Sequence, residues 1–559
     1  MTRKQLTQQL VRAACGGGSS SSQSLPLRRF ALHEHHFGNI GGSNLSATPS
    51  DFHSHLCQKI RHAQERVILA SLYIGVGSRA TQNGIRMGES SKDYCLCKED
   101  EFLQSLYVAA SNEKIKQMQI ILDANRAMRK VSLTNKRNAG QSHDSYQGGS
   151  SLSTNSADTV LSTLKPFIER REGESHSKNS NNGLFLFPVN DQRLCTILPS
   201  PLDEVAGVFH IKAYLVDDEL ILSGANLSEE YFSNRLDRYM LFNNGGGGLV
   251  DFYADLCDTL CSCAIKYDGQ SSSLLSALKN DSARKQQLES SLTRLFVDET
   301  HTTLPHSSSH DVSEPVAYAI PTFQMPKSFL GRPFQFQSDV DASRNLLLAA
   351  VESEQNMSVR LSSAYLNLTP RLTSLLTMFG NKRGGAPYVL TAGAMSHGFA
   401  PKKKTQSLQH NVGLVDRIKA SIPEAFLTLV KEASQSIVAC GGKVLLYQRP
   451  GWTFHAKGVW LTANDTDTSR RELIDNPSSV VSTIIGSGNY GARSEDLDVE
   501  SNCIVIFNES STSSEPMKQS VASEWNNMCK HSTVPIDLDF REDVSKLTTV
   551  VVQFMKKFL

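Results

Sequence analysis

The sequence lacks an excess of charge of either sign, a long hydrophobic run and a framework of cysteines. Its 559 residues carry 57 Lys and Arg against 56 Asp and Glu, a formal net charge of +1. Non-specific binding of nucleic acid depends on clustered positive charge, so this balance disfavours that class of protein. No stretch approaches the ~18 consecutive apolar residues of a membrane-spanning helix. Any membrane contact is therefore expected to be peripheral.

The 11 cysteines have neither the even number nor the spacing of a secreted disulfide scaffold, which favours a reducing compartment. The tightest group is Cys257, Cys261 and Cys263, and no histidine or fourth cysteine stands at ligand spacing beside it. Buried thiols on a helix are the favoured interpretation. We predict no metal site and no cofactor.

The N-terminal segment has a composition of its own. It holds five arginines and lysines and no acidic residue before Glu34, and Ser and Gly fill the stretch 16–24. Leu6, Leu10, Val11 and Ala14 form a short apolar stripe at helical spacing. This pattern is typical of an organellar transit peptide, with a disordered tail as the alternative. Residues 1–40 are accordingly predicted to lie outside the fold.

The rest of the chain carries one plan twice. Helix-like stretches at 52–65 and 342–354 precede apolar strands that end at Tyr73 and Tyr365. Further on, His210 and Lys212 alternate along one apolar segment, and His455 and Lys457 alternate along another. Side chains two apart on a strand share a face, so each pair is expected to point the same way.

The spacings support a duplication. A second apolar run and a small-residue turn follow each His-x-Lys, and the turns contain Asn226 and Asn489. Asp237 and Glu500 each stand 11 residues after these asparagines. The other spacings differ between the copies by amounts that polar insertions account for, as expected of surface loops.

We therefore expect an α/β protein made of two α/β/α sandwich units related by a pseudo-twofold axis, with the active site at their interface. The predicted segments are a transit or disordered region (1–40), a first unit (41–268) with insertions at about 131–156 and 172–182, a linker (269–315), and a second unit (316–559) with an insertion at about 462–479.

The repeated residues suit phosphodiester chemistry. Two neutral imidazoles, His210 and His455, facing each other can serve as nucleophile and general acid. The two lysines and two asparagines would donate to the non-bridging oxygens of a phosphate, in place of a metal. An acid at 237 or 500 could hold the Nδ1–H of a histidine and leave Nε2 free to attack.

At these residues the chain resembles the phospholipase D superfamily, whose mark is H-x-K-x4-D followed by G-[SG]-x-N in each repeat. The first copy matches through His210, Lys212 and Asp217, then Gly224 and Asn226. The second matches through His455 and Lys457, then Gly486, Ser487 and Asn489, but Thr462 stands where the pattern has Asp. The resemblance implies a structural role for this Asp, and Asp465, Asp467 or Asp475 could substitute for it.

Longer strings are similar to the eukaryotic phosphatidylglycerophosphate synthase branch. They include Ala70-Ser-Leu-Tyr-Ile-Gly75, Leu222 to Tyr239, and Gly451-Trp-Thr-Phe-His-Ala-Lys-Gly458. The resemblance implies transfer of a phosphatidyl group from CDP-diacylglycerol to sn-glycerol 3-phosphate through a phosphatidyl-histidine, with CMP released. It also implies a mitochondrial location, at the inner-membrane surface, without excluding a plastid.

Further residues are candidates for substrate binding. Arg235 and Arg238 could bind a phosphate through bidentate contacts, or could lie on a solvated helix face. Tyr73 and Tyr365 end their strands where a substrate would lie, with buried aromatic packing as the alternative. Ser487 lies in the second turn. The rival functions are a phosphatidylserine synthase, a phospholipase or other phosphodiesterase, and an inactive scaffold.

Overall fold

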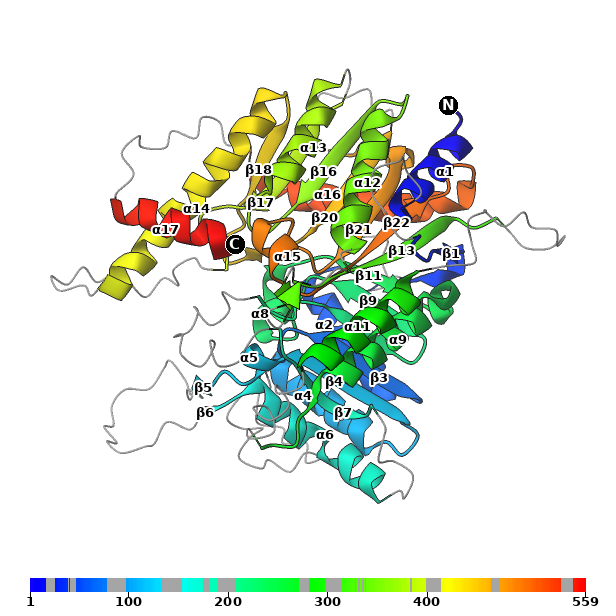
Figure 1. Cartoon of the computed structure of the whole chain (residues 1–559), viewed down its shortest axis with the longest axis vertical. Coiled ribbons are helices and arrows are strands. Elements are labelled where there is room, and N and C mark those ends of the chain that lie inside the picture. The colour runs from blue at the N-terminus through cyan, green and yellow to red at the C-terminus, as the bar shows by residue number, and fades with distance from the viewer. Residues whose placement is uncertain are drawn as a thin grey trace.

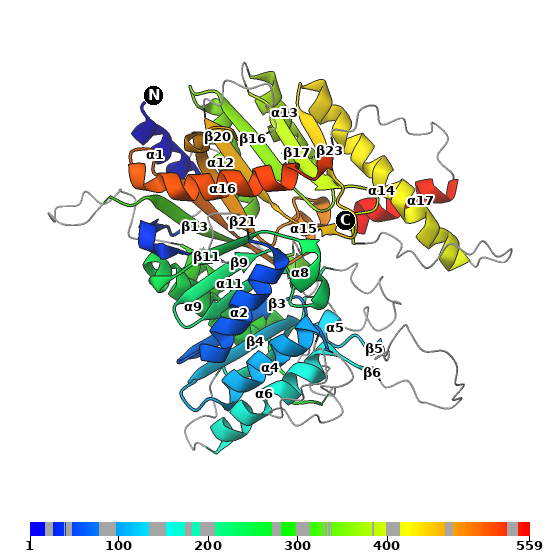
Figure 2. The same ribbon diagram turned by 180° about the vertical axis from the view of Figure 1, so that it is seen from behind.

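The computed structural model contains two large β-sheets, each flanked by helices on both faces (Figures 1 and 2). The residues that the structure describes are 1–16, 26–38, 40, 47–77, 97–132, 153–173, 181–189, 207–270, 281–297, 314–326, 328–329, 332–333, 336, 338–382, 385–398, 414–463, 473–533 and 546–558.

The sheet of the first half has eight strands in the order β12-β7-β4-β3-β8-β9-β11-β2. Their bounds are β2 (Phe37–Gly38), β3 (Arg66–Ser71), β4 (Gln117–Asp123), β7 (Gly183–Phe187), β8 (Ala213–Val216), β9 (Glu219–Ser223), β11 (Tyr239–Phe242) and β12 (Ile265–Lys266). One face is covered by α2 (Pro49–His62), α4 (Lys98–Ser111) and α6 (Ser156–Glu172), and the other by α9 (Leu249–Cys263) with α11 (Asp281–Phe296) (Figures 1 and 2). Strand β3 is buried from Val67 to Ser71, and its mostly apolar sequence is typical of a strand that is covered on both faces.

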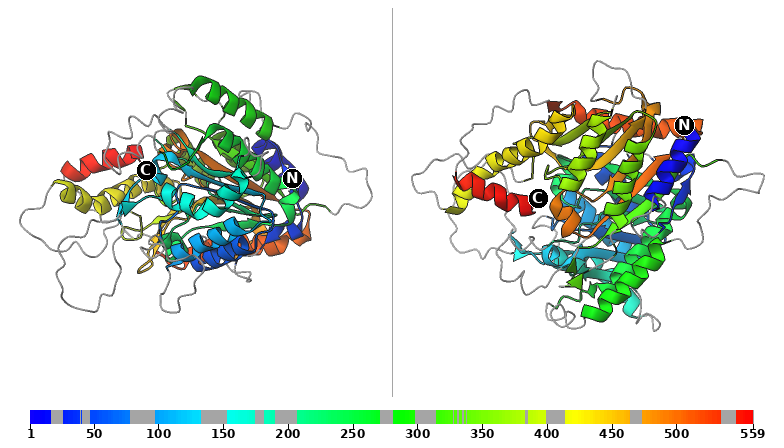
Figure 3. Two further views of the ribbon diagram at one scale, coloured as in Figure 1. Left: turned by 90° about the horizontal axis from the view of Figure 1, so that it is seen from below. Right: turned by 45° about the horizontal axis from the view of Figure 1, so that its top comes forward.

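The sheet of the second half has nine strands in the order β1-β13-β22-β21-β20-β16-β17-β18-β23. Their bounds are β1 (Phe30–Leu32), β13 (Ala317–Gln324), β16 (Met357–Ser362), β17 (Pro387–Ala392), β18 (Lys443–Tyr447), β20 (Gly458–Ala463), β21 (Val480–Gly486), β22 (Glu500–Phe507) and β23 (Ser532–Thr533). One face carries α1 (Arg3–Ala14), α12 (Ser338–Glu352), α13 (Pro370–Asn381) and α14 (Leu414–Ala439), and the other carries α16 (Glu515–Cys529) (Figures 1 and 2). At the edge, α14 pairs with α17 (Lys546–Phe558), and both lie far from α1 (Figure 3).

Six strands of each sheet follow the same order and directions. In the first half, β7, β4 and β3 are parallel, and β8, β9 and β11 continue antiparallel. In the second half, β18, β17 and β16 are parallel, and β20, β21 and β22 continue antiparallel. The α/β architecture is the predicted one, whereas the strand order was not predicted from the sequence. The pseudo-twofold axis itself stays a prediction.

Short elements complete the described structure. They are α5 (Ala124–Ala127), α8 (Glu229–Ser233), α15 (Ala492–Asp496), β5 (Val131–Ser132) with β6 (Ser153–Thr154), β14 (Ser328–Phe329) with β15 (Arg332–Pro333), and β10 (Arg235–Leu236) with β19 (Thr453–Phe454). None of the described helices has both the length and the apolar character needed to cross a bilayer.

The N-terminal segment differs from the expectation that it lies outside the fold. The side chains of Leu6, Leu10, Val11 and Ala14 are buried, and α1 packs against α12 and β22. Residues 30–32 and 37–38 add strands to the two sheets. An amphipathic stripe is equally suited to a core-facing helix and to a transit peptide, which is why the sequence did not separate the two. A targeting role stays a prediction.

The predicted insertions and linker are only partly described. Residues Asp281–Phe296 of the linker form α11, whose Leu288, Leu292 and Phe296 are buried in the core. Most of the insertions at 131–156, 172–182 and 462–479 lies outside the described residues, as do Asp465 and Asp467. The cysteines of the 257–263 group are buried on α9, with their thiols free.

Candidate active site

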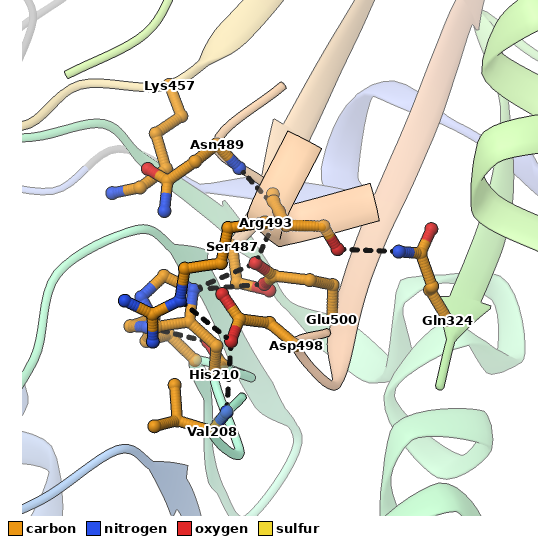
Figure 4. Close-up of polar contacts among 12 residues, drawn as sticks. Val208, His210, Gln324, Lys457, Ser487, Asn489, Arg493, Asp498 and Glu500 are labelled. Carbon is orange, nitrogen blue, oxygen red and sulfur yellow. Dashed lines mark hydrogen bonds and ion pairs between the residues drawn. The ribbon is translucent and has the colours of Figure 1, made fainter. Parts of the chain in front are cut away.

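His210 is positioned by the other half of the chain. It lies just before β8, and its N–H donates to the carbonyl of Val499 (2.8 Å), the residue before Glu500. Its Nδ1 lies 3.0 and 3.1 Å from the two carboxylate oxygens of Glu500, as Figure 4 shows. The carboxylate thus holds the proton on Nδ1 and directs Nε2 toward the cavity described below.

His455 repeats this arrangement in the opposite direction. It lies between β19 and β20, and its N–H donates to the carbonyl of Leu236 (2.8 Å), the residue before Asp237. Its Nδ1 lies 2.6 Å from Oδ2 of Asp237. Each histidine therefore depends on an acid from the other half. The strands predicted through His-x-Lys begin later than expected, β8 at Ala213 and β20 at Gly458. The backbone at each histidine instead bonds to the other half of the chain.

The two lysines lie beside the histidines that they follow. Lys212 Nζ donates to the carbonyl oxygen of His210 (2.6 Å). Lys457 Nζ donates to the carbonyl oxygen of His455 (2.9 Å) and lies 2.7 Å from its Nδ1. Both ammonium groups are buried, so they supply positive charge where a phosphate would lie between the histidines.

Burial sets the protonation of the site. It lowers the pKa of both His210 and His455 well below the ordinary value, with the neighbouring lysines adding to the effect, so both rings are neutral near pH 7. Burial also lowers the pKa of Lys457 to about 8 and raises the pKa of Asp237 to about 6, in each case by disfavouring the charged form. Both groups still carry their charges near neutral pH.

The two asparagines line the same cavity. Asn226 Nδ2 donates to the hydroxyl of Tyr231 (3.1 Å), and the N–H of Asn489 donates to Ser494 Oγ (3.0 Å). Oδ1 of each asparagine is buried and has no hydrogen-bond partner within the described part of the chain. Buried polar groups in proteins are normally paired, so these amides are available to a ligand.

A cavity of about 250 Å³ connects these groups. Both histidines and both asparagines line it, together with Tyr73, Tyr365 and Arg235, which the sequence had suggested as substrate contacts. Arg235 Nη2 lies 2.5 Å from Glu230 Oε2, and its guanidinium lies over the Tyr231 ring. The cavity thus brings together residues from both halves and half of the predicted site residues. Lys212, Lys457, Asp237 and Glu500 do not line it, but each contacts one of the two histidines.

Three predicted residues lie elsewhere. The guanidinium of Arg238 is buried against Trp460, donates to the carbonyls of Lys457 and Ile484, and pairs with Glu524, so it supports the second sheet from within. This position is neither the solvated helix face nor the phosphate contact that the sequence suggested, because the segment after Asn226 crosses into the other half.

Ser487 and Asp217 hold parts of the backbone in place and lie away from the cavity. Ser487 Oγ is buried and bonds to the backbone of Ser501. Asp217 lies at the turn between β8 and β9, where its carboxylate accepts hydrogen bonds from the N–H groups of residues 64–66. Neither residue lines the cavity.

Five polar residues that line the cavity were not predicted from the sequence: Arg126, Glu230, Tyr231, Arg493 and Asp498. Arg126 follows β4 and lies over the Tyr73 ring (4.7 Å). Arg493 Nε donates to Asp498 Oδ1 (3.3 Å), beside His210 (Figure 4). Arg493 and Asp498 stand four and nine residues after Asn489, as Glu230 and Arg235 do after Asn226, so the repeat spacing could have pointed to them.

The comparisons with known proteins agree with this geometry. No family model matches the chain. The CDP-diacylglycerol–glycerol-3-phosphate 3-phosphatidyltransferases named mitochondrial from Cricetulus griseus and Homo sapiens are 27% and 26% identical to it, each over 92% of this chain and 82% of the relative. The enzyme of that name from Saccharomyces pastorianus is 25% identical over 89% of this chain and 83% of its own.

Among solved structures, the phosphatidylserine synthase of Haemophilus influenzae superposes with a TM-score of 0.59 at 16% identity, covering 100% of this chain and 97% of that one. This likeness defines the class of fold: the chain has the α/β fold of phospholipase D-like proteins. Within that class, its homologues over most of its length carry the name CDP-diacylglycerol–glycerol-3-phosphate 3-phosphatidyltransferase, which confirms the resemblance read from the motifs.

Proposed function

We propose that the protein transfers the phosphatidyl group of CDP-diacylglycerol to sn-glycerol 3-phosphate, giving phosphatidylglycerophosphate and CMP. The observation that carries the proposal is the crossed pairing of His210 with Glu500 and of His455 with Asp237 at one cavity. Two neutral imidazoles with fixed tautomers are what a two-step displacement at phosphorus needs.

In the first step, Nε2 of His210 attacks the phosphorus that carries the diacylglycerol. Binding of the negatively charged pyrophosphate raises the pKa of His455, so that its Nε2 takes up a proton. The P–N bond then forms, the pyrophosphate P–O bond breaks, and CMP leaves with this proton from Nε2 of His455. Glu500 keeps its contact with Nδ1 of His210 and stabilises the positive charge that develops on the ring. The product is a phosphatidyl-histidine opposite a neutral His455.

In the second step, Nε2 of His455 takes the proton of the acceptor hydroxyl. The hydroxyl oxygen bonds to phosphorus as the bond to Nε2 of His210 breaks. In both steps the ammonium groups of Lys212 and Lys457 and the Nδ2 groups of Asn226 and Asn489 donate to the phosphoryl oxygens. The side chains of Lys212, Lys457 and Asn226 are buried. The mechanism uses these donors without a metal ion or cofactor.

We assign the remaining charges of the cavity to the substrates. Arg126, Arg235 and Arg493 reach the cavity from three different segments and suit bidentate binding of the acceptor phosphate or the nucleotide phosphate. Tyr73 and Tyr365 then contact the substrate from the two halves. The absence of a spanning helix among the described residues fits peripheral contact with membrane lipid. The relatives that are named mitochondrial support a mitochondrial location. The inner-membrane surface is our proposal for the site within it.

A product assay tests the proposal. Purified full-length protein is given CDP-diacylglycerol in detergent-lipid mixed micelles, with sn-glycerol 3-phosphate, L-serine or water alone as acceptor. The expected result is CMP release with phosphatidylglycerophosphate as the main lipid product. Phosphatidylserine as the main product would favour the activity named for the Haemophilus influenzae structure, and phosphatidic acid in all three reactions would favour a phospholipase. Cleavage of DNA or RNA instead would overturn the lipid substrate.

A further inference from the structure

The loops after the two asparagines have the same spacing but different side chains. Four and nine residues after Asn226 stand Glu230 and Arg235, and after Asn489 stand Arg493 and Asp498. Each loop therefore contains one ion pair, of 2.5 Å in the first half and 3.3 Å in the second, with the positions of the charges exchanged. The two sides of the cavity share a frame, but they present different groups to the two histidines.

The largest difference stands five residues after each asparagine, where the first half has Tyr231 and the second has Ser494. Ser494 Oγ donates to Glu500 Oε1 (2.7 Å) and is thereby directed to the acid behind His210. The hydroxyl of Tyr231 instead crosses the interface and lies 3.2 Å from Nε2 of His455. No described residue bonds to Nε2 of His210, so the two histidines differ in access.

The direction of the Tyr231 hydrogen bond follows from its neighbours. Asp237 Oδ2 accepts the proton on Nδ1 of His455, so Nε2 is an acceptor. Lys457 Nζ also lies 3.3 Å from this Nε2, so the phenol shares the atom with a second donor. Asn226 Nδ2 donates to the phenol oxygen, which leaves the phenol proton for Nε2. Burial raises the pKa of Tyr231, so its hydroxyl stays protonated near neutral pH.

The ring of Tyr231 is held firmly in this position. Its side chain is buried, and it packs edge-on against the His455 ring with centroids 5.1 Å apart. The guanidinium of Arg235 lies 4.7 Å from the Tyr231 ring centroid and is itself held by Glu230. A cation is attracted to the face of an aromatic ring, so the ion pair of the first half also positions the phenol.

We propose that the Tyr231 hydroxyl occupies Nε2 of His455 while the phosphatidyl group is on His210, and so withholds the general base from water until the acceptor alcohol displaces it. Tyr231 is thus a specificity-determining residue that favours transfer over hydrolysis. This inference rests on the proposed function.

Both outcomes of the second step use the same base. With water, the proton moves to Nε2 of His455, the water oxygen bonds to phosphorus, the bond to His210 breaks, and phosphatidic acid leaves. With sn-glycerol 3-phosphate, the glycerol oxygen takes the same path. A water molecule that displaces the phenol gains a hydrogen bond to Nε2 of His455, but the bond between Tyr231 and Nε2 is broken. The exchange therefore gives water no net hydrogen bond. The acceptor is also held by its phosphate, so its hydroxyl is present at a high effective concentration.

The test compares Tyr231→Phe with the wild-type full chain in mixed micelles, with CDP-diacylglycerol labelled in the acyl chain. Phosphatidic acid formation and exchange of labelled CMP are measured without acceptor, and the ratio of transfer to hydrolysis is measured with it. We expect about 10-fold more hydrolysis relative to CMP exchange, since one hydrogen bond of this kind is worth about one factor of ten. The transfer-to-hydrolysis ratio should fall by the same factor.

A matched control is Tyr239→Phe, which removes a buried phenol hydroxyl in the same segment. Within the described structure that hydroxyl has no hydrogen-bond partner, and its ring stacks on Phe52. The transfer-to-hydrolysis ratio of this variant should equal that of the wild type.

An unchanged ratio in an active Tyr231→Phe protein, or a loss of CMP exchange, would overturn the inference. Should this variant fail to fold, 3-fluorotyrosine at position 231 gives a stronger donor of the same shape. It should lower hydrolysis relative to exchange, and an unchanged or higher value would overturn the inference. Wild-type protein with neither CMP exchange nor transfer would remove the proposed function and the inference together, whereas an unchanged ratio removes the inference alone.

Discussion

The first half of the chain ends its catalytic strand in a tight turn, whereas the second half extends that strand into an insertion. At the turn, Asp217 has a positive φ of 50° and accepts hydrogen bonds from the N–H groups of residues 64–66. In the second half, Thr462 continues β20, and its Oγ1 accepts from Arg360, which also donates to the carbonyl of Leu473. Both positions thus anchor a strand, but by different bonds: Asp217 accepts from backbone N–H groups, whereas Thr462 accepts from the side chain of Arg360.

At the cavity the two halves depend on each other. Each histidine takes its backbone register and its acid from the other half, so neither half contains a complete site. The halves then differ in the groups near Nε2, since Tyr231 contacts His455 and no described residue contacts His210 there. The two histidines thus have matching backbone and acid contacts, but different groups lie near their Nε2 atoms.

The largest expected effect comes from the histidines. His210→Ala should lower both CMP exchange and transfer by about 10⁴-fold, because it removes the nucleophile. His455→Ala should lower transfer by about 10³-fold but exchange by less, since the leaving phosphate has a second pKa of about 6 and needs little help from an acid. Exchange assays with labelled CMP, beside acceptor assays, measure the two steps. Equal losses in both variants would mean that the halves share the roles.

Substitution of Glu500 or Asp237 should impair the step that uses the histidine paired with it. Glu500→Gln should impair CMP exchange, and Asp237→Asn should impair transfer, each by about 10²- to 10³-fold, because the amide no longer fixes the tautomer of its histidine. The same two assays check this. A Glu500→Gln protein with normal exchange and impaired transfer would reverse the assignment of the nucleophile.

The pH dependence should be set by Lys457 and Asp237. Lys457 has a pKa lowered to about 8, so its charge is lost as the pH rises through 8. Asp237 has a pKa raised to about 6, so its carboxylate is lost as the pH falls through 6. The rate of transfer should therefore be highest between these values and fall about 10-fold per pH unit outside them.

Lys457→Arg is the matched variant for the alkaline limb. The guanidinium stays charged, so the fall above pH 8 should disappear even where the maximal rate is lower. A pH profile of kcat checks this, and an alkaline limb that is retained in the variant would assign it to another group.

The smallest effects belong to the strand anchors. Asp217→Ala should lower the free energy of unfolding by about 1 kcal/mol, because two exposed N–H groups and one half-buried N–H group lose their acceptor. Thr462→Val should cost about 1 kcal/mol by the loss of one bond to Arg360. Denaturant titration measures both. A fall in kcat for Asp217→Ala in folded protein would instead place this residue in the chemistry.

The α/β class and the two histidines and two asparagines of the site could be predicted from the sequence. These residues stand at matching spacings in the two repeats, which is why they could be identified. His210, His455, Asn226 and Asn489 were identified from such spacing, and the structure places all four at one cavity. Residues that cross between the halves were harder to interpret. Arg238 lies in the same polar string as Arg235, yet its guanidinium enters the second sheet. Only the packing of the halves separates the two arginines.

The N-terminal helix illustrates a different limit. The apolar stripe of Leu6, Leu10, Val11 and Ala14 is visible in the sequence, but nothing local says which surface it covers. Tyr231 was missed for a related reason. Its partner His455 is 224 residues away, so no spacing rule connects them.

The most direct test of the account is to map the covalent intermediate. Protein mixed with labelled CDP-diacylglycerol without acceptor is quenched at alkaline pH, where a phosphorylated histidine survives, digested and analysed by mass spectrometry. The account predicts a phosphatidyl group on Nε2 of His210, lost on addition of sn-glycerol 3-phosphate and absent in His210→Ala. A label on His455, or on neither histidine, would contradict it.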